Sequence, residues 1–218
     1  MKTIAFNGSP RKKHNTASLL EKALEGAMAA GSETEMVHLY DYDFTGCISC
    51  FSCKLIGGKS YGSCAVNDPL TPLLQKAAKA DVLLLGSPMY LASETSRFRA
   101  FFERLIFPYL TYAEEPRTLF QGKIKTGLIY TMGVSEDRIP KVGYDKHFER
   151  AQEYLGRIFG HCEMMYSTET KQFDHPEKYF CPGQHVSARE KRHREVFPED
   201  CARAFELGKR LVFDSKGE

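Results

Sequence analysis

Residues 2–20 read KTIAFNGSPRKKHNTASLL. Residues 2–6 are a short apolar run typical of a buried strand, and residues 17–20 begin a pattern with helical spacing. A strand that passes into a helix through a polar loop forms an anion cradle, because the unpaired N–H groups and the dipole of the helix start favour negative charge. This stretch therefore predicts the first strand, the first helix and a ligand loop between them.

The loop carries side chains that suit a phosphate. Ser9, Asn15 and Thr16 are short polar groups, Arg11 presents a fork of donors, and Gly8 lets the backbone approach a ligand closely. With a single glycine, the loop is neither the dinucleotide fingerprint G-x-G-x-x-G nor a P-loop ending in Gly-Lys-Ser/Thr. These features favour a phosphomonoester. The alternative is an ordinary turn in which Asn15 or Thr16 caps the helix.

Strand and helix patterns alternate along the chain. Strands are expected at residues 3–7, 33–39, 82–86, 126–131 and 163–167, and helices at 16–31, 69–80, 96–107, 147–159 and 198–213. This alternation predicts an α/β fold with a five-stranded parallel sheet and helices on both faces. Right-handed crossovers, together with a ligand loop after the first strand, predict the doubly wound order 2-1-3-4-5.

The length of 218 residues suits one sizeable core, so we expect a single domain over residues 1–218. Two segments, at about 108–122 and 168–197, are longer than a minimal version of this fold needs. Both are rich in Pro, Tyr, Phe and charge. We interpret them as insertions that lie over the ligand crevice or at a subunit contact.

The composition argues against several classes of partner. The net charge of +2 gives no strong attraction to nucleic acid or membrane, and the basic run at 189–194 is interrupted by an acid and lacks aromatics, as on a solvated helix face. No apolar stretch approaches the ~20 residues that span a bilayer, and no signal-peptide pattern precedes the first strand. We expect a cytoplasmic protein whose seven Cys concern metals or redox chemistry rather than structural disulfides.

Two further loops are expected beside the anion loop. Residues 86–91, GSPMYL, leave the third strand, and residues 130–133, YTMG, leave the fourth. Residues 86–91 would form an apolar and aromatic ledge for a planar ring. Alternatively, they simply cover the top of the core. A phosphorylation receiver domain is excluded, because Asn7-Gly8 and Gly86-Ser87 stand where receivers have acidic residues. The candidate residues in these two loops are Pro88, Met89, Tyr90, Leu91, Thr131, Met132 and Gly133.

These motifs resemble those of the flavodoxin-like NAD(P)H-dependent FMN reductases. That family has G-S-P-[VIM]-Y followed by S-x-x-[KR]-x-F-x-[DE]-R. Here GSPMY at 86–90 is followed by Ser96, Arg99, Phe101, Glu103 and Arg104. With the loop at 7–16, the match covers about the first half of the chain. One departure is the single glycine after the fourth strand, where relatives often have two.

The resemblance implies a flavodoxin-like fold that binds FMN. Ser9, Arg11, Asn15 and Thr16 would contact the phosphate, residues 88–91 the isoalloxazine ring, and residues 131–133 its polar edge. It implies hydride transfer from NAD(P)H to the flavin and electron transfer to a small-molecule or protein acceptor, with no catalytic side chain required. A non-enzymatic flavodoxin-like electron carrier is the alternative. A homo-oligomer, dimer or tetramer, and a ferredoxin-type electron partner are further expectations.

Three cysteines follow the pattern C-x-x-C-x-x-C at Cys47, Cys50 and Cys53, and Cys64 comes after a glycine-containing loop. Closely spaced thiols can converge on one iron–sulfur cube. The pattern resembles that of the iron–sulfur flavoproteins, a branch of the same family, and so implies a [4Fe–4S] cluster beside the flavin crevice, although their fourth Cys usually comes sooner. A tetrathiolate zinc site, plain buried thiols and a cysteine-based redox sensor stay open as alternatives.

Overall fold

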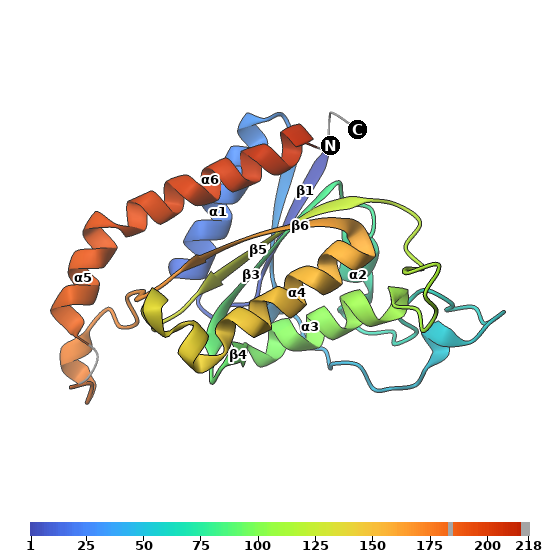
Figure 1. The fold of residues 1–218 in the computed structure, drawn as a ribbon, viewed down its shortest axis with the longest axis horizontal. Helices are drawn as coiled ribbons and strands as arrows, with labels where there is room; N and C mark the ends of the chain where they lie inside the picture. Colours follow the sequence, from blue (N-terminus) through green and yellow to red (C-terminus); the bar gives the residue numbers. More distant parts are fainter. Residues whose placement is uncertain (183–184, 215–218) are drawn as a thin grey trace.

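The computed structural model describes residues 1–182 and 185–214. Residues 183–184 of the second predicted insertion, and residues 215–218 of the predicted domain, lie outside this part. A parallel sheet runs through the middle, in the order β2-β1-β3-β5-β6 (Figure 1). Its strands are β1 (Lys2–Asn7), β2 (Glu33–His38), β3 (Val82–Tyr90), β5 (Ile124–Thr131) and β6 (Gly160–Ser167). The order 2-1-3-4-5 is confirmed, since β5 and β6 are the fourth and fifth predicted strands.

The third strand is longer than its apolar run predicts. β3 continues to Tyr90 because its register with β5 extends to the pair Pro88 and Thr131. The chain then folds back, and the short strand β4 (Ser93–Glu94) pairs antiparallel with the end of β3. The predicted ledge is therefore largely strand, held by neighbours on both sides.

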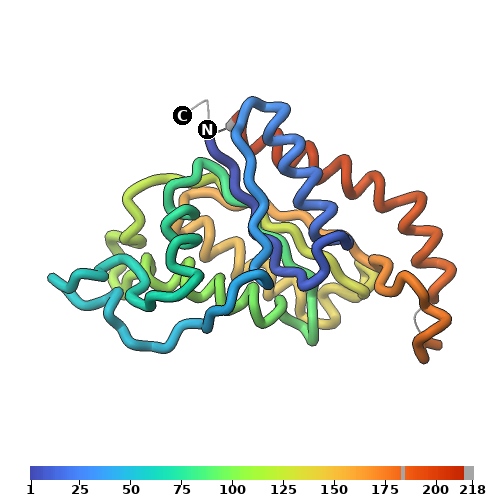
Figure 2. Tube along the Cα trace, turned by 180° about the vertical axis from the view of Figure 1, so that it is seen from behind, coloured from blue at the N-terminus to red at the C-terminus, as the bar shows by residue number. Residues whose placement is uncertain are grey.

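Helices cover both faces of the sheet, as the two views in Figures 1 and 2 show. The residues buried on one face come from α1 and α6, and those on the other from α2, α3 and α4. The helices are α1 (Asn15–Ala29), α2 (Thr71–Ala77), α3 (Ser96–Ile106), α4 (Tyr144–Phe159), α5 (Val186–Glu195) and α6 (Phe197–Asp214). Short 3-10 helices occur at Leu39–Asp41, Ser52–Lys54, Phe107–Tyr109, Glu136–Arg138, Pro140–Val142 and Pro176–Lys178.

The sheet has a hydrophobic core on each face, and alternate side chains of a strand point into one core or the other. On β3, Leu83 and Leu85 join the core under α2, α3 and α4, whereas Val82 and Leu84 join the core under α1 and α6. Successive side chains of a strand point to opposite faces, so a strand covered on both sides must be apolar throughout. This is why the run at 82–85 reads as continuously apolar.

Helices α1 and α6 touch at their backbones, where each contributes a glycine. A Cβ built on Gly208 would lie 1.8 Å from the carbonyl oxygen of Ala23, and one built on Gly26 would lie 1.9 Å from that of Phe205. Real atoms cannot approach so closely, so neither position accommodates a side chain unless the helices separate. The two glycines therefore set the spacing of this helix pair.

We predict that Gly208→Ala lowers the free energy of unfolding by about 3 kcal/mol, because the added methyl group forces α6 away from α1. Gly156→Ala in α4 is the matched control, since its Cβ would meet no atom within 4 Å. That change should leave stability unchanged or raise it by up to about 1 kcal/mol through helix propensity. Urea unfolding of both variants checks this, and equal shifts would contradict the role given to Gly208.

Candidate functional site

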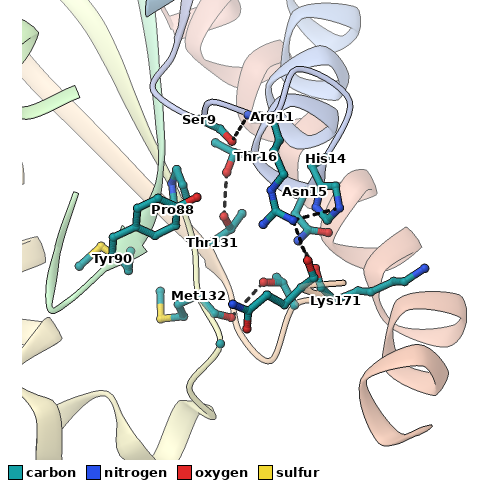
Figure 3. Close-up of a pocket in the computed structure, with 14 residues that line it drawn as sticks. Ser9, Arg11, His14, Asn15, Thr16, Pro88, Tyr90, Thr131, Met132 and Lys171 are labelled. Carbon is teal, nitrogen blue, oxygen red and sulfur yellow. Dashed lines mark hydrogen bonds between the residues drawn. The ribbon is translucent and has the colours of Figure 1, made fainter. Parts of the chain in front are cut away.

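A pocket opens at the carboxyl ends of β1, β3 and β5, where the strand order reverses (Figure 3). The empty space between its walls is about 520 Å³, part of which is open solvent. The lining residues are Ser9, Arg11, His14, Asn15, Thr16, Pro88, Met89, Tyr90, Thr131, Met132, Gly133, Thr170, Lys171 and Gln172.

All the predicted flavin-site residues line this pocket except Leu91. That side chain is fully exposed, and Leu91 and Ala92 have φ values of 50° and 67°. They form the two-residue turn between β3 and β4, and such hairpin turns require positive φ at both positions. The turn directs Leu91 away from the ledge that Pro88, Met89 and Tyr90 supply.

The anion loop is held open by its own polar groups. Ser9 N donates to Asn7 Oδ1 at 2.9 Å, and Arg11 N donates to Ser9 Oγ at 3.1 Å. The helix begins at Asn15 after His14, whose side chain makes no capping hydrogen bond. Neither Asn15 nor Thr16 is the cap that an ordinary turn would use. The start of α1 therefore keeps the donors that suit an anion.

The sequence predicts that Gly8 lets the backbone approach a ligand, but the structure gives this glycine a different role. Its N–H donates to Gly86 O at 2.8 Å, and its own carbonyl accepts from Thr95 Oγ1 at 2.6 Å. A Cβ here would lie 2.6 Å from the Cβ of Phe98 on α3. Gly8 does not line the pocket. Its small size serves the close approach of α3 rather than that of a ligand.

Several predicted phosphate donors bond to the chain itself in this structure. Arg11 Nη1 donates to Gln172 O at 2.6 Å, and Asn15 Nδ2 donates to Lys171 O at 2.8 Å. Thr16 Oγ1 lies 2.7 Å from Thr131 Oγ1. The carbonyls of residues 171–172 thus occupy donors that a bound anion would need, so ligand binding must displace or share these contacts.

The sequence reasoning missed His14, Thr170, Lys171 and Gln172 as pocket residues. His14 lies inside the anion loop itself. Burial, and then the charge of Arg11, lowers the pKa of His14. The other three belong to the segment 168–197, for which a place over the crevice was one of the two expectations. None of the described lining residues is acidic, and Arg11 and Lys171 bring positive charge to the pocket. Asp174, which does not line the pocket, lies 3.6 Å from Lys171 Nζ and 3.7 Å from His14 Nε2.

A buried polar network fixes the ledge from behind. The side chain of Glu94 is fully buried, accepts from Tyr130 Oη at 2.9 Å and lies 2.8 Å from Nε2 of His147. Burial raises the pKa of Glu94, but the imidazole of His147 and the hydroxyl of Tyr130 outweigh it and hold that pKa below its usual range. The network joins β4 to β5 and α4, and so stabilises the hairpin that carries Met89 and Tyr90.

The four predicted cysteine ligands line a second, smaller pocket beside the end of α3. Cys53 is buried, and this burial raises its pKa, whereas Cys47 and Cys50 are exposed. The N–H and hydroxyl of Ser52 lower the pKa of Cys50. Within residues 1–182 and 185–214, no three Cys, His, Asp or Glu side chains converge closely enough to hold a metal ion.

Arg104 organises this cysteine pocket. Its side chain is 1% exposed, and its guanidinium makes a two-pronged ion pair with Asp68. Nε donates to Cys64 Sγ at 3.3 Å, while the two Nη atoms donate to Thr45 O and Val66 O at 3.1 and 3.2 Å. One buried cation therefore holds both ends of the cysteine loop.

The cysteine pocket does not adjoin the first pocket within the chain, contrary to expectation. The two share no lining residue, and Figures 1 and 2 place residues 47–64 and α5 at opposite ends of the molecule. After β2 the chain runs back along α3: Arg97 Nη1 donates to Phe44 O, and Lys54 Nζ donates to Phe107 O and Leu110 O. The cysteines are thereby carried to the far end of α3.

The insertion at 108–122 also lies away from the first pocket. No residue of this segment lines that pocket, whereas Pro108 lines the cysteine pocket. The segment follows the C-terminal end of α3, and a crossover helix runs antiparallel to its strands, so this end faces the amino edge of the sheet. Of the described residues in the two predicted insertions, residues 170–172 line the first pocket, so they alone meet the expectation of a place over the ligand crevice.

Residues 1–171 match the model of the NADPH-dependent FMN reductase family. This match spans most of the chain, and the chain belongs to that family. None of the helices in the described part is long and apolar enough to cross a membrane.

Two archaeal relatives and one solved structure are similar to this chain. An iron–sulfur flavoprotein of Methanocaldococcus jannaschii is 31% identical over 137 residues, which cover 63% of this chain and 64% of the relative. One of Archaeoglobus fulgidus is 35% identical over 104 residues, 48% of each chain. The chain thus spans less than two thirds of these relatives. The NAD(P)H:quinone oxidoreductase of Methanothermobacter marburgensis shares the fold, with a TM-score of 0.68, 19% identity and coverage of 97% and 98%.

Proposed function

We propose that this chain binds FMN in the first pocket, takes hydride from NAD(P)H and passes electrons to a small-molecule or protein acceptor. The observation that carries the proposal is the pocket itself. Three loops at the carboxyl edge of the sheet meet around a cationic lining with no acid. One end offers donors for a phosphate and the other an apolar ledge, which is the division of chemistry that FMN requires.

The residues present fit FMN by their chemistry. Ser9, Asn15 and Thr16 are each less than 8% exposed, so a phosphate that reaches them leaves water and gains strong hydrogen bonds. Arg11 adds a charge that attracts and orients the phosphate. Tyr90 remains 42% exposed at the ledge, where a planar ring would cover it. This arrangement supports a site for the phosphate beside α1 and a site for the ring beside the end of β3.

Bound FMN supplies the acceptor for hydride and hands electrons onward. The chain's own role would be to bind and orient the FMN and to shield it from water. The start of α1 and Arg11 hold the phosphate end, and the buried Glu94 network keeps the ledge in place behind the ring. The backbone of residues 131–133, which lines the pocket, would face the polar edge of the ring. No side chain is assigned the role of acid or base.

We also propose that Cys47, Cys50, Cys53 and Cys64 bind a [4Fe–4S] cluster. Their thiols line one cavity, and the N–H group that Arg104 donates to Cys64 suits a thiolate ligand. Two relatives are named iron–sulfur flavoproteins. Binding requires Cys47 and Cys50, on the exposed part of the loop, to turn inward. The cluster would supply one-electron exchange at this end of α3.

The single-domain organisation, a homo-oligomeric state (dimer or tetramer), a ferredoxin-type electron partner and a cytoplasmic location stay predictions. They rest on the length of the chain, its composition and the family resemblance. The same holds for the expected absence of nucleic-acid and membrane partners, which rests on a net charge of +2.

We predict that Arg11→Ala combined with Thr16→Ala weakens FMN binding by at least about 1.5 kcal/mol per lost charge-assisted bond, roughly tenfold or more. Lys12→Ala is the control: it removes the same charge from the same loop, but Lys12 pairs with Asp41 and does not line the pocket. Flavin titrations measure both. Unchanged affinity in a folded double variant would remove the basis for the phosphate site.

Anaerobic mixing of the FMN-loaded protein with NADPH or NADH should bleach the flavin at a rate that saturates with nucleotide. Saturation is expected because hydride transfer requires a bound nucleotide. Stopped-flow absorbance measures this rate. If neither nucleotide reduces the flavin while a reduced ferredoxin does, the protein is an electron carrier and the reductase proposal fails.

Anaerobic reconstitution with iron and sulfide should give a thiolate-to-iron absorption band in the wild-type protein. Cys64→Ser should reduce or abolish this band, because the fourth ligand is lost. Cys201→Ser is the control, since Cys201 lies on α6, outside the cysteine pocket. Metal and sulfide analysis completes the measurement. Zinc uptake without sulfide would replace the cluster by a zinc site, and no uptake at all would leave plain thiols.

A further inference from the structure

Arg189 joins two walls of the first pocket from behind. It lies on α5, beyond the part of the chain that matches the family model. Its Nη2 donates to Gly133 O at 2.7 Å, and its Nη1 donates to Thr170 O at 3.2 Å. Both acceptors belong to residues that line the pocket. A single guanidinium thus ties the loop after β5 to the segment after β6.

The contact at Gly133 is close. A Cβ on Gly133 would lie 3.2 Å from Nη1 of Arg189, so the guanidinium packs tightly against this glycine and would have to shift by a few tenths of an ångström to admit a side chain. The charge of Arg189 therefore lies directly against the backbone that faces the pocket.

The position of α5 is itself fixed by a buried carboxylate. Asp200, which is 2% exposed, accepts from Arg192 Nη2 at 2.7 Å, Arg203 Nη2 at 2.6 Å and Ser167 Oγ at 2.6 Å. Burial raises the pKa of Asp200, but these three donors outweigh it and keep that pKa below its usual range. A charged Asp200 fastens α5 to the end of β6, so Arg189 is held rather than free to swing away.

The charge of Arg189 has no carboxylate partner in contact. Among the described residues none forms an ion pair with it, and its guanidinium donates to the carbonyl oxygens of Thr170 and Gly133. Glu169 is the acidic group whose field reaches it, partly offsetting the burial that lowers the pKa of Arg189. An arginine keeps its charge at any ordinary pH. The pocket wall at residues 131–133 is therefore backed by a fixed positive charge.

We propose that Arg189 is a positioning residue that favours the reduced, negatively charged form of FMN. The inference rests on the proposed function, in which residues 131–133 face the polar edge of the ring. Reduction brings negative charge to that edge, and a nearby fixed cation stabilises it. Arg189 acts through the Gly133 backbone and does not line the pocket itself. It should raise the midpoint potential of bound FMN.

The test compares Arg189→Gln, Arg189→Lys and Arg194→Gln in the full chain. Arg194 lies on the same helix with its side chain exposed, so it controls for the loss of one charge from α5. For each variant, FMN affinity is titrated, and the midpoint potential is measured by anaerobic equilibration with redox dyes. The titration gives the affinity for oxidised FMN, and the midpoint potential relative to that of free FMN gives the ratio of the affinities for reduced and oxidised FMN.

Arg189→Gln should lower the reduced-to-oxidised affinity ratio by roughly tenfold, as expected for a unit charge at close range in a partly buried site. Arg189→Lys should recover most of that ratio, because it keeps the charge, even if oxidised FMN binds more weakly. Arg194→Gln should match the wild type. The lysine variant also keeps the test informative if the glutamine variant fails to fold.

Two results would overturn this inference and leave the proposed function intact. The first is an unchanged ratio in Arg189→Gln, and the second is an equal loss of affinity for both forms, which would make Arg189 a purely structural link. A wild-type chain that binds no FMN would instead overturn the proposed function, and this inference with it.

Discussion

Close approach at Gly8 and Gly86 is the constraint on which the rest of the structure depends. The 2.8 Å hydrogen bond from Gly8 N to Gly86 O joins the anion loop to β3. Methyl groups at these positions would meet Phe98 of α3 and Leu20 of α1 at 2.6 Å. The glycines therefore let helices on opposite faces close onto one edge of the sheet. The start of α1, the end of β3 and the loop after β5 meet there as one pocket.

Helix α3 connects the two candidate sites, which lie at its opposite ends. Thr95 at its start accepts from Phe98 N and donates to Gly8 O, so this end supports the anion loop. Arg104 near its finish holds Cys64, Asp68 and both ends of the cysteine loop. A buried arginine is stable only when its donors are satisfied, and here the ion pair and the carbonyls do this. The same helix thus organises an anion site at the carboxyl edge of the sheet and a thiol cavity at the other.

The first pocket is built so that charge converges on it from several elements. Arg11 comes from the anion loop and Lys171 from the segment after β6. Arg189 stands behind the wall at Gly133, held in place through the contact of Arg192 with Asp200. The carbonyls of Lys171 and Gln172 now satisfy donors of the anion loop. The segment after β6 therefore both shapes the pocket and competes with whatever enters it.

The sequence by itself determined the fold and most of the first pocket. Period-two and period-3.6 patterns and the position of the ligand loop are local properties, and they predict the strand order. The loop motifs, together with the family resemblance that they carry, predict eleven candidate residues, ten of which line the first pocket. Only the tertiary structure decided the rest. Leu91 does not line the pocket because strand pairing extends β3 and places a turn there. Contacts between segments distant along the chain bring Lys171 into the pocket lining and Arg189 behind the wall at Gly133. The cysteines lie away from the first pocket because hydrogen bonds from Arg97 and Arg104 of α3 hold their loop along that helix and at its C-terminal end. The spacing of residues in the sequence gives no information about such long-range contacts.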